Sequence, residues 1–316
     1  MAWRSSTLPL TRREFLAAAA LTGLSACRDN GMSPTTRPYV WGKQGLRHGE
    51  FQHPRAIGAW REEVYVIDTT GRIQVFDFDG AYRRGWSTPD SENGTPTGLA
   101  FSSQNTLLIP DTHYSQIIEY SPEGSLIRRW GKYGTGEDEF IYPTDIVQAP
   151  DNNYYISEYG LGAQRIHVFD ADGRFARQWG GPGDGAGEFS RAMAIDIDSQ
   201  GTLHVADTAN HRVQCFRLDG TFLRTVGEGG AGPGQLKFPY DVTVAPDDSV
   251  LVSEYGNHRI SRFTSNGAFA ACYGKPGRAP GEFDGPRGVA VAENGLVFVA
   301  DTDNHRVQRV PLEVLC

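Results

Sequence analysis

The chain has 316 residues, among them 38 Gly and 18 Pro, and its formal net charge at pH 7 is −8. Its Val- and Ile-rich apolar residues come in short runs separated by turn residues, which is typical of strands rather than helices. An acidic chain is a poor partner for nucleic acid, and no apolar run is long enough to form a permanent membrane-spanning helix.

The N-terminus has the pattern of a secretory signal peptide. Residues 10–27, LTRREFLAAAALTGLSAC, contain a pair of arginines, a short Ala- and Leu-rich run and small residues before Cys27. These are the basic, apolar and cleavage regions of a signal peptide. We expect residues 1–26 to be removed, and the loss of three arginines and one glutamate then changes the net charge from −8 to −10.

The same segment resembles the twin-arginine signals of bacterial proteins that are exported already folded. The residues on that pattern are Thr11, Arg12, Arg13, Phe15 and Leu16. LSAC, residues 24–27, resembles a lipobox, which implies that Cys27 becomes the acylated first residue. The resemblance implies a lipid-anchored protein of the cell envelope, on its periplasmic face, with residues 27–38 as a tether. The alternative is an amphipathic N-terminal helix with a buried cysteine.

From residue 39 onward one unit is repeated six times. In the fourth copy it reads RAMAIDI, TLHVAD, HRVQCFR and TFLRTVG, which are four short strands separated by turns. An acid closes the second strand of every copy, at Asp68, Asp111, Glu158, Asp207, Glu254 and Asp301. The sixth copy has no fourth strand, whereas residues 38–42, PYVWG, match one. We predict that this N-terminal strand completes the sixth unit and closes a ring.

A family resemblance covers residues 39–316, and copies 3 to 6 carry it most strongly. Residues 238–263, FPYDVTVAPDDSVLVSEYGNHRISRF, and residues 285–310, GPRGVAVAENGLVFVADTDNHRVQRV, resemble NHL repeats. The Asn-His-Leu type of triplet occurs here as Asn-His-Arg. The resemblance implies an all-β, six-bladed β-propeller over residues 39–316. The second copy departs from the pattern, with HYSQ at residues 113–116 and an irregular link before it.

The repeated histidines, His211, His258 and His305, raise the question of a shared zinc site. Equivalent atoms in a six-fold ring are as far from each other as from the axis, so three of them could bind one metal at about 2.1 Å only on the axis itself. A structural role has a clearer mechanism, because an acid and an arginine face each other across the same loop. The pairs are Asp68–Arg72, Glu158–Arg165, Asp207–Arg212, Glu254–Arg259 and Asp301–Arg306.

A functional site should lie where the copies differ. At the start of the first strand, copies 3 and 5 carry Asp145 and Asp241 where the other copies have Ala or Gly. We expect Asp145 to approach Glu158 and Asp241 to approach Glu254. Such paired carboxylates can bind a cation such as Ca²⁺ or share a proton. The alternative is that an arginine neutralises each glutamate and that each aspartate caps a loop.

Two arginines also break the repeat, at a position that should line the mouth of the ring. Arg55 and Arg287 occupy it in copies 1 and 6, which ring closure makes neighbours. Arginines, acids and tyrosines around one opening favour a small polar or zwitterionic ligand, a peptide or a protein. The predicted ligand-binding residues are Arg55, Asp145, Glu158, Tyr159, Tyr240, Asp241, Glu254, Tyr255 and Arg287.

The alternative function is that of a metal-assisted hydrolase or lyase at the same mouth. The chain resembles propeller lyases that act on amidated-peptide precursors, which implies zinc held by histidines at the starts of the first strands. The residues there are Arg55, Thr97, Thr144, Met193, Tyr240 and Arg287, so the zinc ligands do not carry over. Calcium-dependent propeller lactonases use acids near the axis, and Asp145, Glu158 and Asp241 keep that possibility open. We therefore predict a binding module first and an enzyme second.

Overall fold

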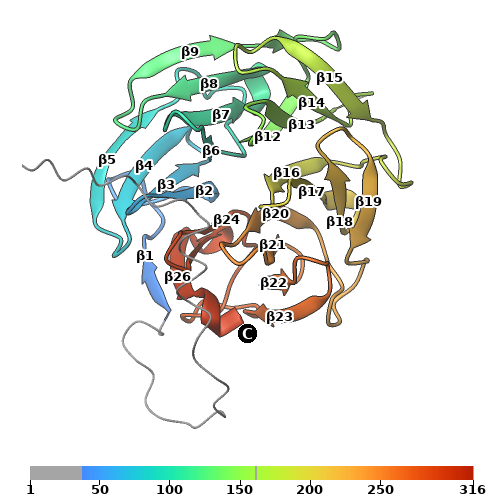
Figure 1. Cartoon of the computed structure of the whole chain (residues 1–316). Coiled ribbons are helices and arrows are strands. Elements are labelled where there is room, and N and C mark those ends of the chain that lie inside the picture. Colours follow the sequence, from blue (N-terminus) through green and yellow to red (C-terminus); the bar gives the residue numbers. More distant parts are fainter. Residues whose placement is uncertain (1–37, 161, 316) are drawn as a thin grey trace, which may run out of the picture. The chain divides into compact units, whose positions relative to one another are not determined.

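The computed structural model describes residues 38–160 and 162–315. In that part of the chain six four-stranded sheets stand around a central axis, and they follow one another in chain order (Figure 1). The predicted all-β, six-bladed propeller is confirmed. No helix among the described residues is long and apolar enough to cross a membrane. The signal peptide, Cys27 and the tether up to residue 37 lie outside the described residues.

Each blade is an antiparallel sheet whose strands follow in chain order from the axis outward. Blade 1 has β2 (Pro54–Trp60), β3 (Glu63–Asp68), β4 (Arg72–Asp77) and β5 (Tyr82–Ser87). Blade 2 has β6 (Ala100–Phe101), β7 (Leu107–Asp111), β8 (Gln116–Tyr120) and β9 (Leu126–Trp130). Blade 3 has β12 (Tyr142–Gln148), β13 (Tyr154–Tyr159), β14 (Arg165–Phe169) and β15 (Phe175–Gly180).

Blade 4 has β16 (Ala192–Ile197), β17 (Thr202–Asp207), β18 (Arg212–Arg217) and β19 (Phe222–Val226). Blade 5 has β20 (Pro239–Val244), β21 (Val250–Glu254), β22 (Arg259–Phe263) and β23 (Phe269–Tyr273). Blade 6 has β24 (Val289–Val291), β25 (Leu296–Asp301) and β26 (Arg306–Pro311), and its outer strand is β1 (Tyr39–Trp41). The remaining elements are the pair β10 (Lys132–Tyr133) and β11 (Glu139–Phe140) and the 3₁₀ helices η2 (Thr112–Tyr114), η3 (Thr208–Asn210), η4 (Thr302–Asn304) and η5 (Leu312–Leu315).

Burial explains the strand sequences. The second and third strands are Val- and Ile-rich and buried along most of their length, because each sheet packs between two neighbouring sheets. The outer strands alternate between half-buried and exposed residues, as in β5 and β15, because only one of their faces is covered. The hydrophobic clusters accordingly combine residues from two adjacent blades.

The ring closes through β1, as predicted. Strand β1 pairs antiparallel with β26, and Trp41 stands opposite Val307. The Trp41 side chain is 8% exposed, and its ring lies 6.1 Å from that of Phe76 in blade 1 and 6.2 Å from that of Phe298 in blade 6. The N-terminal strand therefore joins the last blade to the first.

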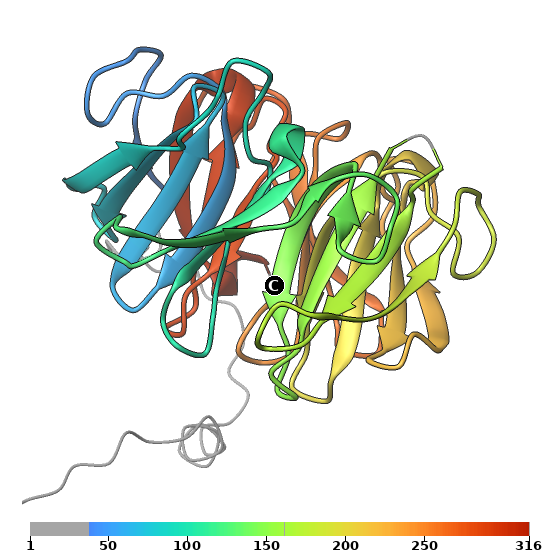
Figure 2. The ribbon, with the colours of Figure 1, turned by 90° about the horizontal axis from the view of Figure 1, so that it is seen from above.

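Most links between blades contain a loop of the same structure. Short parallel bridges stabilise it, at Gln44–Phe51, at β10–β11 and at three later links, and the loop buries an aromatic or leucine side chain each time. Gly134 in the third-blade link has φ +151°, and a Cβ there would lie 2.0 Å from the Glu139 carboxylate. These links bring the chain from an outer strand back to the next inner strand, and loops project from both ends of the sheets (Figure 2).

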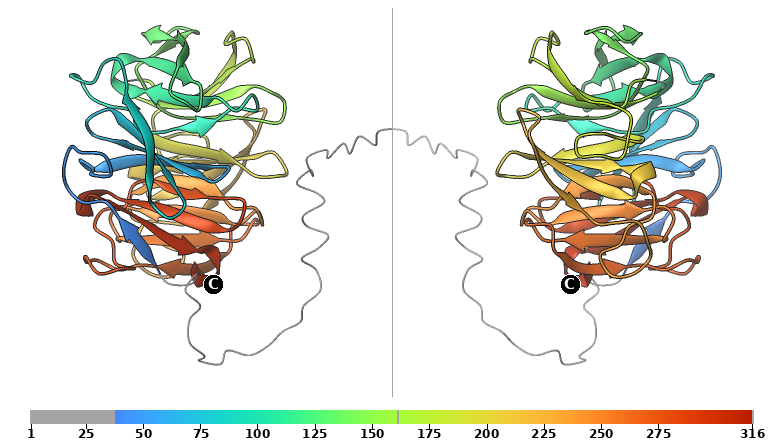
Figure 3. Two further views of the ribbon diagram at one scale, coloured as in Figure 1. Left: turned by 90° about the vertical axis from the view of Figure 1, so that its left-hand side faces the viewer. Right: turned by 90° about the vertical axis from the view of Figure 1, so that its right-hand side faces the viewer.

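Side-chain hydroxyls fasten neighbouring blades at one end of the ring. We call this end, where the inner strands β2, β6, β12, β16, β20 and β24 begin, the mouth face. Hydroxyl groups there donate to a carbonyl oxygen of the next blade, from Thr97 to Thr144 (3.0 Å), Thr144 to Ala192 (2.7 Å), Thr208 to Pro239 (2.5 Å), Ser253 to Arg287, and Thr302 to Pro54 (2.7 Å). The starts of the inner strands are thus fixed relative to one another, and the stacked sheets are seen from two sides in Figure 3.

Candidate ligand-binding site

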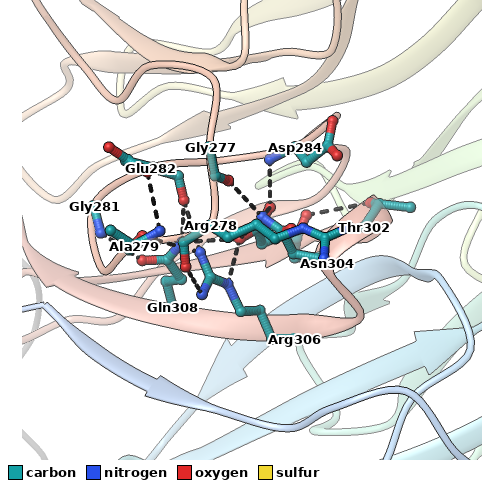
Figure 4. A network of polar contacts seen from close by, with 12 residues as sticks. Gly277, Arg278, Ala279, Gly281, Glu282, Asp284, Thr302, Asn304, Arg306 and Gln308 are labelled. Atoms are coloured by element: carbon teal, nitrogen blue, oxygen red, sulfur yellow. Dashed lines mark hydrogen bonds and ion pairs between the residues drawn. The ribbon is translucent and has the colours of Figure 1, made fainter.

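The loop between the second and third strands is built on the predicted ion pairs. All five are present, with N–O distances of 2.5 Å (Arg72–Asp68), 3.0 Å (Arg165–Glu158), 2.8 Å (Arg212–Asp207), 2.7 Å (Arg259–Glu254) and 2.6 Å (Arg306–Asp301). In blade 6, Asp301 also accepts hydrogen bonds from the Asp284 backbone and from the Asn304 and Gln308 side chains (Figure 4). The repeated acids therefore organise the loop.

The repeated histidines hold consecutive blades together. His211, His258 and His305 have positive φ angles, and the Nδ1 atom of each accepts a backbone N–H bond from the next blade. The donors are Phe238 (3.0 Å), Gly285 (3.0 Å) and, across the ring closure, His53 (3.1 Å). In blade 3 the side-chain oxygen of Gln164 accepts the equivalent N–H bond from Arg191, at 2.8 Å. The sequence signal for this role, which we missed, is the constant spacing of 27 residues between acceptor and donor.

The expected approach of Asp145 to Glu158 is wrong. A β-bulge places Pro143 opposite Glu158 but Asp145 opposite Ser157, so the two acids point to opposite faces of the sheet. Glu158 is fully buried, where Arg165 and His167 (2.8 Å) contact its carboxylate. In blade 5 the same shift separates Asp241 from Glu254, because Asp241 stands opposite Ser253.

Asp145 and Asp241 belong instead to a row of acids on the inner strands. Asp145 accepts the Ile195 N–H bond of blade 4 in 2.9 Å, and Asp241 accepts the Val289 N–H bond of blade 6 in 2.8 Å. Asp196, which the sequence analysis missed, accepts the Val244 N–H bond of blade 5 in 2.7 Å. Its sequence signal is an acid inside the apolar strand AMAIDI.

Burial raises the pKa of all three aspartates. The charge of Asp241 further raises the pKa of Asp145, and the charge of Asp196 further raises that of Asp241, which reaches about 7. Asp145 is 7% exposed, whereas Asp196 and Asp241 are half-buried. Asp241 is therefore partly protonated near neutral pH, and Asp196 and Asp241 remain accessible to water.

Arg55, Arg287, Tyr240 and Tyr255 come together at the mouth face, and we call them the arginine cluster. The guanidinium carbon of Arg287 lies 4.7 Å from the ring centroid of Tyr240 and 5.2 Å from that of Tyr255. Burial, and then the charge of Arg287, lower the pKa of Arg55, so the two cations are close enough to repel each other. The structure thus unites predicted residues of blades 1, 5 and 6.

Blade 3 presents Tyr159 toward the same opening. Tyr159 is close enough to Arg55 to influence its pKa, and its ring lies 5.3 Å from that of Tyr142. The guanidinium of Arg191 lies 5.2 Å from the Tyr159 ring. Asp303 accepts a hydrogen bond from Tyr255 (3.0 Å) and contacts His53 (3.1 Å). None of these four was predicted: His53, Tyr142 and Arg191 share the variable repeat position at the start of the inner strand, and Asp303 lies in the loop after the second strand.

Two family models match the chain. Residues 283–310 match the model of the NHL repeat, and residues 147–226 match a model described as a 6-bladed beta-propeller. The chain is a six-bladed β-propeller that contains an NHL repeat. Within residues 38–160 and 162–315 of this propeller, no group of three or more His, Cys, Asp or Glu side chains could hold a metal ion.

Three known proteins are similar to this NHL propeller. Peptidyl-glycine alpha-amidating monooxygenase of Mus musculus is 26% identical over 185 residues, which are 55% of this chain and 18% of that protein. Protein brain tumor of Drosophila melanogaster is 23% identical over 112 residues, which are 35% of this chain and 10% of that protein. The chain therefore covers less than a fifth of either relative. Virginiamycin B lyase of Staphylococcus aureus has the same fold, with a TM-score of 0.61 at 12% identity over 87% of this chain and 98% of the lyase.

Proposed function

We propose that this NHL propeller is an exported, membrane-tethered binding module that holds a protein, a peptide or a small polar ligand at its mouth face. The observation that carries the proposal is the arginine cluster, in which Arg55 and Arg287 approach each other without forming an ion pair with any described carboxylate. Export and the tether rest on the twin-arginine and lipobox patterns of residues 10–27.

The surroundings of the cluster suit a ligand with both polar and apolar parts. Tyrosine rings supply rigid apolar area with a polar end, and they lower the entropy cost of binding because they have few rotatable bonds. The inner strands that carry these side chains are fixed to their neighbours by the hydroxyl and aspartate bonds described above. The acid row on blades 3 to 5 provides carboxyl groups that a positive group of the ligand can pair with, so a zwitterionic compound or a peptide fits this face.

A second candidate function is that of a lyase or hydrolase at the same face. The similarity to the mouse amidating enzyme over 55% of the chain favours it. An enzyme of this kind would use phenol or imidazole groups for proton transfer, and Tyr240, Tyr255 and His113 lie at the mouth face. Conversion of a bound compound would distinguish this candidate from the binding module.

A compound panel tests the proposal. The purified full chain is mixed with amino acids, dipeptides, sugar acids and neutral amides, and both its Tm and the mass of each compound are measured. A ligand present at 100 times its Kd stabilises the fold by about 2.7 kcal/mol. We expect such a gain without chemical conversion, and we expect Tyr240→Ala combined with Tyr255→Ala to abolish it.

The control is Tyr133→Ala, because Tyr133 is 74% exposed and lies in a link between blades. This variant should bind like the parent. Conversion of a compound would favour the enzyme, and binding that survives the double tyrosine variant would place the ligand on another surface.

A further inference from the structure

Many arginines of the described chain have carboxylate partners, such as Arg84 with Glu63 (2.6 Å). Others, such as Arg177, donate to a backbone carbonyl oxygen. Within residues 38–160 and 162–315, Arg55 and Arg287 form no ion pair, and the Nε–H group of each is buried without a hydrogen-bond partner. A buried donor without a partner costs about 1–3 kcal/mol, so these two positions are unfavourable in the free protein.

The fold forces the two arginines together. Ring closure makes blades 6 and 1 neighbours, and their backbones touch at this point, because a Cβ added to Gly288 would lie 2.8 Å from the carbonyl oxygen of Arg55. Arg287 is further held over the rings of Tyr240 and Tyr255. The two half-buried guanidinium groups are thus close enough for the charge of Arg287 to lower the pKa of Arg55.

We propose that Arg55 and Arg287 form an oxyanion site that binds a carboxylate or phosphate group of the ligand. The proposal rests on the proposed binding function and defines the group by which the ligand is anchored. An oxyanion bound to the two half-buried guanidinium groups accepts their N–H bonds and neutralises the repulsion. Both guanidinium groups are planar and always charged, so the site needs no proton transfer to become competent.

The neighbouring side chains limit where the anion lies. Asp303 already accepts a hydrogen bond from the Tyr255 hydroxyl and contacts His53, so both of its carboxylate oxygens are engaged. The acid row begins with Asp241, next to Tyr240 in the chain, and its charge disfavours an anion deeper along the axis. The oxyanion therefore stays between the arginines, and the rest of the ligand extends over the tyrosines.

The test uses sodium acetate and inorganic phosphate as probes, with sodium chloride at equal ionic strength as reference. The full chain carries ¹⁵N-labelled arginine, and the Nε–H signals are assigned with the variants Arg55→Lys and Arg287→Lys. We expect saturable shifts of the Arg55 and Arg287 signals with acetate, with phosphate or with both. Arg83, which is 56% exposed and paired with Asp77 in blade 1, should not shift.

The variants Arg55→Gln and Arg287→Gln should each weaken probe binding at least tenfold, whereas Arg83→Gln should leave it unchanged. Because each glutamine variant removes the repulsion, its Tm without probe should equal or exceed that of the parent, which shows that the fold is intact. A response to acetate alone assigns a carboxylate, and a response to phosphate alone assigns a phosphate.

Unshifted Arg55 and Arg287 signals, or equal affinity in the glutamine variants and the parent, would overturn the oxyanion site. If neutral amides from the compound panel still bind at Tyr240 and Tyr255, the binding function stands without it. If no compound binds at the mouth face, both proposals fail.

Discussion

At the scale of single residues, the position of a carboxylate on its strand decides what it does. The loop acids such as Asp301 are fully buried but meet an arginine and several N–H donors, so their charges are compensated. Asp145, Asp196 and Asp241 meet only backbone and hydroxyl donors and one another, and burial dominates their pKa values. A carboxyl group in the loop therefore stabilises the fold as an anion, whereas a carboxyl group on an inner strand resists ionisation.

Asp241 should make the stability of the propeller depend on pH between 8 and 5.5. Its pKa is about 7 in the folded chain, above the value of about 3.9 in an unfolded chain. The folded state therefore takes up the proton first, and stability rises as the pH falls through 7. The variant Asp241→Asn cannot titrate, so its Tm should rise less over this range, by about 2 °C or more relative to the parent.

Thermal unfolding of both proteins in a series of buffers measures this difference. The asparagine variant also loses one acceptor, for the N–H group of Val242 or Val289, so only the slope against pH is compared and not the absolute Tm. Parallel pH profiles would contradict the assignment of the raised pKa to Asp241.

At the scale of the elements, blades 3 to 6 each contribute the same bond to the next blade. The histidine of one loop accepts an N–H bond from the start of the next blade, and blade 3 uses Gln164 for the same purpose. Blade 2 also lacks the acid–arginine pair of the loop. Asp111 is contacted by Gln116 in place of an arginine, and its second carboxylate oxygen has no hydrogen-bond partner. Burial raises the pKa of Asp111 to about 6. The irregular copy is thus also the one whose loop acid is least compensated.

Replacement of His258 should separate a structural role from metal binding. In His258→Gln the amide oxygen can accept the Gly285 N–H bond as Gln164 accepts that of Arg191, so stability should change by less than about 1 kcal/mol. In His258→Ala the N–H group loses its partner, and stability should fall by about 1–2 kcal/mol. Chemical unfolding measures both values, and an equal loss in the two variants would contradict this role.

Deletion of residues 38–42 should open the ring. The deletion removes β1, exposes the edge of β26 and leaves Phe76 and Phe298 without the ring of Trp41. Loss of a buried tryptophan alone costs roughly 3–5 kcal/mol, so the variant should melt well below the parent and aggregate. Trp41→Phe, which keeps the strand and most of the apolar area, is the matched control. Equal melting of the deletion variant and the parent would show that β1 does not close the ring.

At the scale of the whole molecule, the fold and the predicted export signal occupy different parts of the chain. Residues 38–160 and 162–315 form the propeller, whereas the export and lipid patterns occupy residues 10–27, outside the described part. A twin-arginine signal suits a ring of this kind, because its last blade is completed by the first strand and the whole chain must be present before it closes.

Export through the folded-protein route should depend on the paired arginines. Replacement of Arg12 and Arg13 by lysine should leave a precursor in the cytoplasm, and Cys27→Ser should abolish labelling with a fatty acid. Cell fractionation and metabolic labelling measure the two effects. Normal maturation of the lysine variant, or continued labelling of the serine variant, would remove the corresponding claim.

The sequence by itself determined the architecture, because that information is local and repeated six times. The strand alternation, the loop ion pairs and the PYVWG strand at residues 38–42 each follow from patterns within one unit. Only the tertiary structure decided how the acids are placed. A one-residue bulge turned Asp145 away from Glu158 and placed it in the acid row with Asp241. Ring closure already predicted Arg55 and Arg287 as neighbours, but the placement of Arg287 over Tyr240 and Tyr255 depends on side-chain packing. Strand register at a bulge and side-chain packing cannot be read from the residues of a single repeat.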